Sequence, residues 1–162
     1  MRLLIMIFID VLVNMVDINN IQYQRDLEFG HKEEIRIKKI LEEYFGELKI
    51  LDKYNPFDFE NDDYLIELKS RRINHDKYDT AMVNYSKILR TANSNKIRMI
   101  VFNYEDGIYC WQVDSDEYEL GRGGRSDRGI EEVYTMCFVK KEYLQNINNY
   151  TKINNHHHQL EQ

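Results

Sequence analysis

The spacing of apolar residues along the chain predicts an alternation of helices and strands. Residues 27–45 carry apolar side chains at i, i+3, i+4 and i+7, which predicts an amphipathic helix that ends at Gly46. Its apolar stripe consists of Ile37, Ile40, Leu41 and Tyr44. Residues 78–92 show a similar stripe and predict a second helix, whereas the dense apolar run at 97–102 is typical of a buried strand.

The remaining segments complete an α/β pattern. Strands are predicted at residues 49–53, 108–113 and 133–139, and a hairpin at 56–72. The glycine-rich residues 121–129 predict a loop, and residues 141–147 a short terminal helix. The predicted order is therefore helix, three strands, helix and strand, followed by C-terminal additions.

The hairpin places charged side chains where they can meet. Alternation along its second strand points Glu67 and Lys69 to one face and the apolar neighbours of Glu67 to the other. Asn61–Asp63 has the composition of a turn, and folding back there brings Asp58 near Glu67. Two adjacent carboxylates repel each other unless a cation joins them, and hard oxygen ligands suit Mg²⁺ or Mn²⁺. The hairpin therefore predicts a divalent-metal site with a lysine beside it.

This pattern resembles the PD-(D/E)XK nuclease superfamily, which has the restriction-endonuclease-like fold. The resemblance rests on Pro56, Asp58 and the triplet Glu67-x-Lys69. It also rests on the predicted element order, which matches an αβββαβ core over roughly residues 27–102. The implied fold is α/β, with a mixed central sheet flanked by helices and with C-terminal β additions.

The resemblance also implies roles for the hairpin residues. Asp58 and Glu67 would hold Mg²⁺, or alternatively Mn²⁺, and the carbonyl of Leu68 would add a ligand. Lys69 would orient or deprotonate the attacking water. The alternative is an ordinary hairpin that carries these residues by coincidence.

A further acidic position is implied on the first helix. Many members of the superfamily carry a Gly-x-x-x-Glu pattern there, and Gly30 and Glu34 have this spacing. Glu34 is the expected metal ligand, with Glu33 as the fallback. The competing interpretation is that both carboxylates are simply exposed near a helix N-terminus. The Gln-x-x-x-Tyr pattern that some branches carry on the second helix is absent, and Lys87 is expected to face solvent.

Local basic patches are candidates for phosphate contacts, although the net charge of the chain is −6. The candidate nucleic-acid-binding residues are Arg71, Arg72, Arg122, Arg125 and Arg128. The first two adjoin Lys69, and the other three lie on the glycine-rich segment. The alternatives are solvated faces for both patches and a plain connector for the glycine-rich segment.

The function predicted from these residues is metal-dependent hydrolysis of DNA phosphodiester bonds. The expected partner is DNA, with RNA left open and a homodimer as an option, and no membrane association is expected. The alternative is a non-catalytic nucleic-acid-binding or assembly protein with a nuclease-like fold. For that role the apolar Met1–Val16 segment would be the docking element.

The length of 162 residues and the 43% hydrophobic content fit one domain with a substantial core. The predicted organisation is an apolar N-terminal extension (1–26), a nuclease-like domain (27–150) and a polar C-terminal tail (151–162). Cys110 and Cys137 show no ligand spacing and are expected to be buried strand residues. This usage fits a reducing compartment, cytoplasmic or otherwise intracellular.

Overall fold

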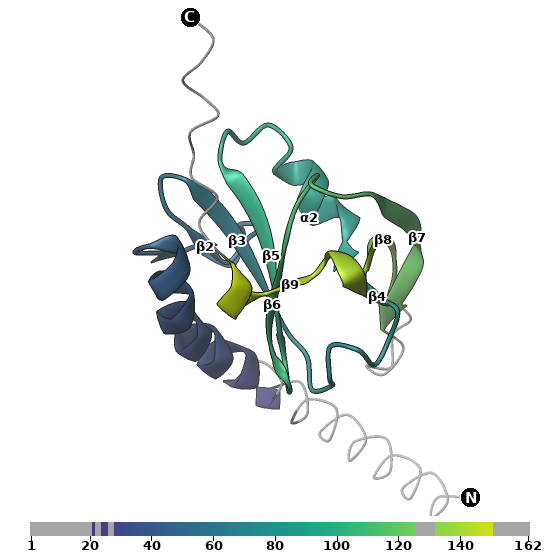
Figure 1. Cartoon of the computed structure of the whole chain (residues 1–162), viewed down its shortest axis with the longest axis horizontal. Coiled ribbons are helices and arrows are strands. Elements are labelled where there is room, and N and C mark those ends of the chain that lie inside the picture. Colours follow the sequence, from purple (N-terminus) through teal and green to yellow (C-terminus); the bar gives the residue numbers. More distant parts are fainter. Residues whose placement is uncertain (1–20, 22–23, 26–27, 126–131, 151–162) are drawn as a thin grey trace, which may run out of the picture.

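Two β-sheets form the framework of the structure (Figure 1). The computed structural model describes residues 21, 24–25, 28–125 and 132–150. The strands are β1 (Lys49–Ile50), β2 (Phe59–Glu60), β3 (Tyr64–Ser70), β4 (Thr80–Asn84), β5 (Ile97–Tyr104), β6 (Gly107–Gln112), β7 (Tyr118–Arg125), β8 (Glu132–Lys140) and β9 (Gln145–Asn146). The six-stranded sheet has the order β1-β2-β3-β5-β6-β9, and the three-stranded sheet has the order β4-β8-β7.

The large sheet is mixed, as the sequence predicts. β3 and β5 run parallel, with Glu67 opposite Ile100, and the other neighbouring strands pair antiparallel. The chain is therefore a mixed α/β protein. The element order differs from the predicted αβββαβ core, because β4 lies between β3 and the second helix, α2 (Tyr85–Arg90).

The first helix covers one face of the large sheet. It is continuous over residues 28–45, and its buried Ile37 and Leu41 pack against Ile66 and Leu68 of β3. Gly46 ends it with a positive φ of 84°, and the Gly46 N–H donates to a carbonyl of the last turn at 3.1 Å. The predicted helix and its apolar stripe are confirmed.

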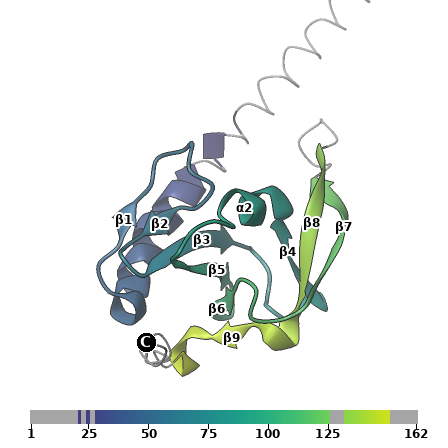
Figure 2. The same cartoon turned by 90° about the horizontal axis from the view of Figure 1, so that it is seen from above.

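The opposite face of the large sheet is covered by α2 and the small sheet (Figure 2). Val83 of β4 and Val139 of β8 lie in one buried cluster with Ile100 and Phe102 of β5. Trp111 of β6 joins them. The described part of the chain therefore has two apolar cores, one on each side of the large sheet.

The helix predicted over residues 78–92 is wrong in its first half. Thr80–Asn84 forms strand β4, in which Ala81 and Val83 are buried and pair with Val139 and Cys137 of β8. Tyr78, the first residue of the predicted stripe, is exposed. Apolar residues at this spacing fit both a helix and a strand, and pairing with β8 decides for the strand.

The prediction of a loop over residues 121–129 is wrong for residues 121–125. Residues up to Arg125 belong to β7, and residues 126–131 lie outside the described part of the chain. The glycines serve close packing: a Cβ on Gly121 would lie 2.9 Å from the Phe138 ring, and one on Gly123 would lie 2.8 Å from the Met82 sulfur. Glycine here makes room for large neighbours within a sheet.

The C-terminal region also differs from its prediction. The expected helix over residues 141–147 is replaced by a 3₁₀ turn, η1 (Lys141–Tyr143), strand β9, and a second 3₁₀ turn, η2 (Ile147–Asn149). Ile147 is buried, so this segment closes the core on the side of the first helix. Gln145 and Asn146 extend the large sheet by pairing with β6.

The predictions for the cysteines and for the two ends of the chain have different outcomes. Cys110 and Cys137 are free and buried in strands β6 and β8, as expected. Apart from residues 21 and 24–25, the N-terminal extension (1–26) lies outside the described residues, and so does the tail (151–162). Over the residues that are described, no helix combines the length and apolar character needed to cross a membrane.

Candidate functional site

The predicted hairpin forms, and its turn is built by one side chain. The Asn61 amide oxygen accepts hydrogen bonds from the N–H groups of Asp63 and Tyr64, at 3.0 and 2.8 Å. β2 and β3 then pair antiparallel, with Phe59 opposite Ile66. This register places Asp58 just beyond the short strand β2, beside the segment of β3 that carries Glu67.

Asp58 is held in place by both its backbone and its side chain. Its N–H donates to the Ile66 carbonyl at 3.0 Å, and its Oδ2 accepts the N–H of Leu68 at 2.7 Å. β2 begins only at residue 59, so the Asp58 carboxylate takes the place of a backbone partner for Leu68. These two hydrogen bonds therefore fix the Asp58 carboxylate next to β3.

Glu67 is completely buried, which is rare for an acidic residue. Its Oε1 accepts a hydrogen bond from Lys69 and a second from Lys87 of α2, the latter at 2.5 Å. Its Oε2 is buried and accepts no hydrogen bond within the described part of the chain. A buried carboxylate oxygen without a partner is costly, and a cation bound there would remove that cost.

The two carboxylates influence each other electrostatically. The pKa of Asp58 is raised to about 7, first by burial and then by the negative charge of Glu67. The Leu68 N–H and the charges of Lys87 and Lys69 oppose this rise. The two carboxylates are therefore close enough for their charges to interact, and one more positive charge near both would stabilise their ionised forms.

Lys87 is the functional candidate that sequence reasoning misses. A helix over residues 78–92 would place it on a solvated face, whereas α2 begins only at Tyr85, with Asn84 as its N-cap. In this short helix Lys87 extends toward β3 and binds Glu67. Asn84 is a detectable cap signal in the sequence, but nothing local connects Lys87 with a glutamate twenty residues earlier.

Glu34 does not join this site, which corrects the expectation for the first helix. Glu34 pairs with His31 at 3.7 Å, and Glu33 pairs with Arg36 and with the Asn103 side chain, both at 2.7 Å. The helix packs on the sheet face that carries Ile66, while Glu67 points to the opposite face. Alternation along β3 therefore separates these carboxylates from Glu67.

The predicted phosphate-binding arginines occupy different environments. Arg71 directly follows β3, and its N–H donates to the Asn103 carbonyl at 2.8 Å. The guanidinium of Arg72 lies over the Phe29 ring of the first helix, 4.1 Å from its centroid. Arg122 is exposed on β7. Arg125 ends β7, its side chain lies outside the described part, and so does all of Arg128.

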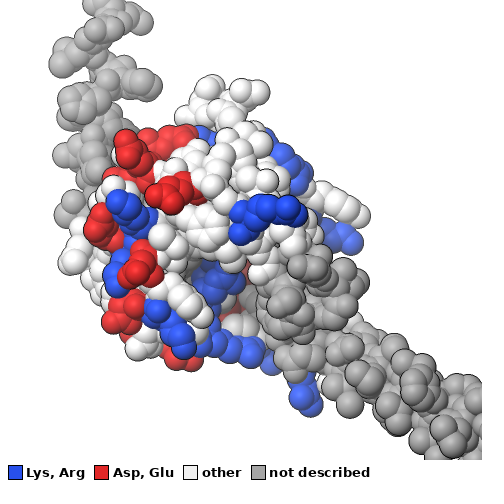
Figure 3. Space-filling view, turned by 90° about the vertical axis from the view of Figure 1, so that its right-hand side faces the viewer, with Lys and Arg blue, Asp and Glu red and all other residues white. Residues whose placement is uncertain are grey.

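Charge is unevenly distributed over the surface. Figure 3 shows the side that lies to the right in Figure 1, where α2 and the small sheet are found. Basic side chains gather around a hollow near the centre of this face, and acidic side chains gather toward its left. A chain with a net charge of −6 therefore still presents a locally basic surface.

Comparison with known proteins identifies the family of this chain. The family model described as "Phage putative PDDEXK endonuclease" matches residues 22–147. This match covers the helix over residues 28–45, α2 and all the strands of the two described sheets, so the chain belongs to this family of PD-(D/E)XK nuclease-like proteins. No curated protein and no solved structure gives a significant match.

The residues present fit the divalent metal that this family implies. Asp58 and Glu67 offer carboxylate oxygens beside β3, and Glu67 Oε2 is buried without a partner among the described residues. Hard oxygen ligands of this kind suit Mg²⁺ or Mn²⁺. The carbonyl of Leu68 remains a predicted further ligand.

Proposed function

We propose that this protein is a metal-dependent nuclease that hydrolyses DNA phosphodiester bonds. The observation that carries the proposal is the buried carboxylate of Glu67, which two lysines bind through one oxygen while the other oxygen lacks a partner among the described residues. The raised pKa of the adjacent Asp58 supports it, because strongly shifted pKa values cluster at functional sites.

Asp58 and Glu67 would hold Mg²⁺ or Mn²⁺. When bound, such an ion polarises a phosphoryl oxygen and lowers the pKa of a water molecule. Asp58 is oriented for this role by the Leu68 N–H, and Glu67 by its two lysines. Binding needs both carboxylates ionised, so we expect it to strengthen as the pH rises through about 7, where Asp58 loses its proton.

The two lysines have separate roles in this proposal. Lys69 follows Glu67 on the same face of β3 and would position the attacking water or remove its proton. Lys87 reaches the same carboxylate from α2, so it would fix the Glu67 rotamer and neutralise charge that develops on the phosphate. Their side chains are 21% and 29% exposed, which leaves each ammonium group partly accessible to a substrate.

Basic residues outside the site would bind the DNA backbone. Arg71 and Arg72 follow β3 directly and so lie near the end of the strand that carries Lys69. Arg122 is exposed on β7, in the sheet that covers the same face of the large sheet as α2. Arg125 and Arg128 remain candidates from the sequence. Such contacts are independent of DNA sequence and weaken with salt.

The proposal is tested by incubating the purified protein with labelled duplex, single-stranded and branched DNA and with RNA, in Mg²⁺, Mn²⁺ or EDTA. We expect metal-dependent cleavage that Lys69→Ala reduces by about 100-fold or more, since positioned acid–base groups contribute at least that much. Asp58→Ala should abolish cleavage through loss of metal binding. Lys38→Ala is the matched control, because Lys38 is also 21% exposed and paired with a glutamate, but on the first helix.

Two outcomes contradict the proposal. Cleavage that survives in both the Lys69 and the Asp58 variants would mean that the active site lies elsewhere or that a contaminant cuts the DNA. A wild-type protein that binds no divalent ion and cuts no substrate would favour the non-catalytic binding protein.

A further inference from the structure

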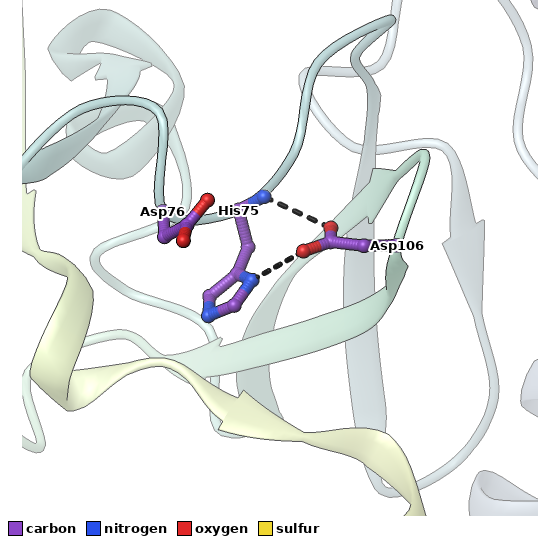
Figure 4. Close-up of side chains that lie close together, drawn as sticks. All are labelled: His75, Asp76 and Asp106. Carbon is purple, nitrogen blue, oxygen red and sulfur yellow. Dashed lines mark hydrogen bonds and ion pairs between the residues drawn. The ribbon is translucent and has the colours of Figure 1, made fainter.

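A second group of metal-ligating side chains lies outside the site at Asp58 and Glu67. It consists of His75, Asp76 and Asp106, whose candidate ligand atoms all lie within 4.8 Å of one another (Figure 4). His75 and Asp76 belong to the connection between β3 and β4, and Asp106 belongs to the turn between β5 and β6. Residues thirty positions apart in the sequence thus converge at one point.

Three contacts hold His75, and two of them involve its imidazole ring. Its Nδ1 lies 2.6 Å from Oδ2 of Asp106, and the His75 backbone N–H donates to the other oxygen of the same carboxylate at 2.9 Å. The ring stacks on Tyr109 of β6, with the centroids 4.3 Å apart and the planes 14° from parallel. The ring orientation is therefore fixed before any ligand arrives, which lowers the entropic cost of binding.

The local backbone is also ordered around this group. The Glu105 N–H donates to the Ile73 carbonyl at 3.0 Å, so the connection after β3 is joined to the β5–β6 turn by main chain as well as by side chains. The His75 and Asp106 side chains are 32% and 29% exposed. Both are thus partly withdrawn from water yet open to an ion.

We propose that His75, Asp76 and Asp106 form a second metal site, which binds Zn²⁺. A neutral imidazole with carboxylates is a ligand set typical of Zn²⁺, whereas Mg²⁺ prefers oxygen ligands alone. Tetrahedral coordination at about 2.1 Å places ligand atoms roughly 3.4 Å apart, so Nδ1 of His75 and Oδ2 of Asp106, which lie 2.6 Å apart, must separate slightly and release the proton between them, while Asp76 moves closer. The exposed Asp76 side chain can rotate inward to allow this.

Zn²⁺ at this point would join the connection after β3 to the β5–β6 turn. The inference does not depend on the nuclease proposal, because the two sites share no residue and favour different ions. Zn²⁺ that binds only the folded state would stabilise the protein. Above the dissociation constant, this stabilisation grows with the logarithm of the Zn²⁺ concentration divided by that constant.

The test is calorimetric titration of the full chain with Zn²⁺, beside thermal melts with and without the ion. His156–His158 are replaced by alanine throughout, because three consecutive histidines bind Zn²⁺ by themselves. His75→Ala and Asp76→Asn are compared with His31→Ala. His31 is the matched control, since it is an exposed histidine that also pairs with a carboxylate.

We expect one equivalent of Zn²⁺ to bind, with affinity reduced at least about tenfold by His75→Ala and by Asp76→Asn but unchanged by His31→Ala. Mg²⁺ binding should be unchanged in all three variants, which separates this site from the one at Asp58. Asp76→Asn decides the question if His75→Ala does not fold. Zn²⁺ affinity that is unchanged in Asp76→Asn, or no binding by the parent protein, would overturn the proposal and leave the histidine as a structural link only.

Discussion

The substitution Asp58→Asn measures how strongly the two carboxylates of the site destabilise the metal-free protein. Asparagine keeps the size of the side chain and an oxygen that can accept the Leu68 N–H, but it cannot ionise. Burial and the charge of Glu67 raise the pKa of Asp58 from 3.8 to about 7. The variant should therefore lose an unfavourable charge without losing a hydrogen bond.

The size of the effect follows from the shift in the pKa of Asp58. A rise from 3.8 to about 7 corresponds to about 4 kcal/mol, at about 1.4 kcal/mol per unit, and this is an upper bound. Because the folded state has the higher pKa, it holds the proton to higher pH than the unfolded chain does. The contribution of Asp58 to the free energy of unfolding therefore falls between about pH 4 and pH 7, with at most about 3 kcal/mol of that fall above pH 5.

The assay is urea unfolding of both proteins in EDTA at pH 5 and pH 8. Subtracting wild type from variant cancels the titration of the groups that they share. From pH 5 to pH 8, we expect the free energy of unfolding of the variant to rise by about 1–3 kcal/mol relative to that of the wild type. We also expect the variant to lose divalent-metal binding. Asp62→Asn, on the exposed hairpin turn, controls for the chemical change itself. If the free energies of unfolding of variant and wild type differed by the same amount at pH 5 and pH 8, the raised pKa of Asp58 and the coupling of the two carboxylates would be refuted.

Three further predictions test other parts of the structure. Lys87→Ala should lower cleavage by about 10-fold or more while Lys38→Ala leaves it unchanged, because Lys87, unlike Lys38, binds the buried glutamate; equal rates in a cleavage assay would remove α2 from the site. Arg122→Ala should weaken DNA binding in EDTA for all sequences and lower the salt slope by about one, and an unchanged slope would exclude a phosphate contact. Gly121→Ala should destabilise the protein by about 1–3 kcal/mol in urea melts, since its Cβ would meet an aromatic ring at 2.9 Å. Gly30→Ala, which meets nothing within 4 Å in the first helix, should instead stabilise it by about 0.5–1 kcal/mol.

The hairpin and the first helix were predictable because their signals are local. Asn61 specifies the turn, and strict alternation in Tyr64–Ser70 sends Glu67 and Lys69 to one face. The helical stripe of Ile37 and Leu41 has one consistent period. The superfamily could also be named from these elements, because the residues that resemble its motif lie within a single hairpin.

Other elements were ambiguous in the sequence because their apolar spacing fits two periods. Ala81 and Val83 suit a helix face as well as a strand face, and only pairing with β8 selects the strand. Gly121 and Gly123 suggest a loop when read alone, whereas in the sheet they leave space for side chains of β8 and β4. Neighbouring strands from distant parts of the chain supply the missing information.

The sequence by itself therefore determined the acidic hairpin, its lysine and the family. The tertiary structure decided which other residues reach the site. Lys87 joins Glu67 because α2 packs on the same face of the large sheet, and Glu34 does not because the first helix packs on the opposite face. Such contacts depend on which face of a sheet each helix covers, and that choice is made by the packing of the two cores rather than by any local pattern of residues.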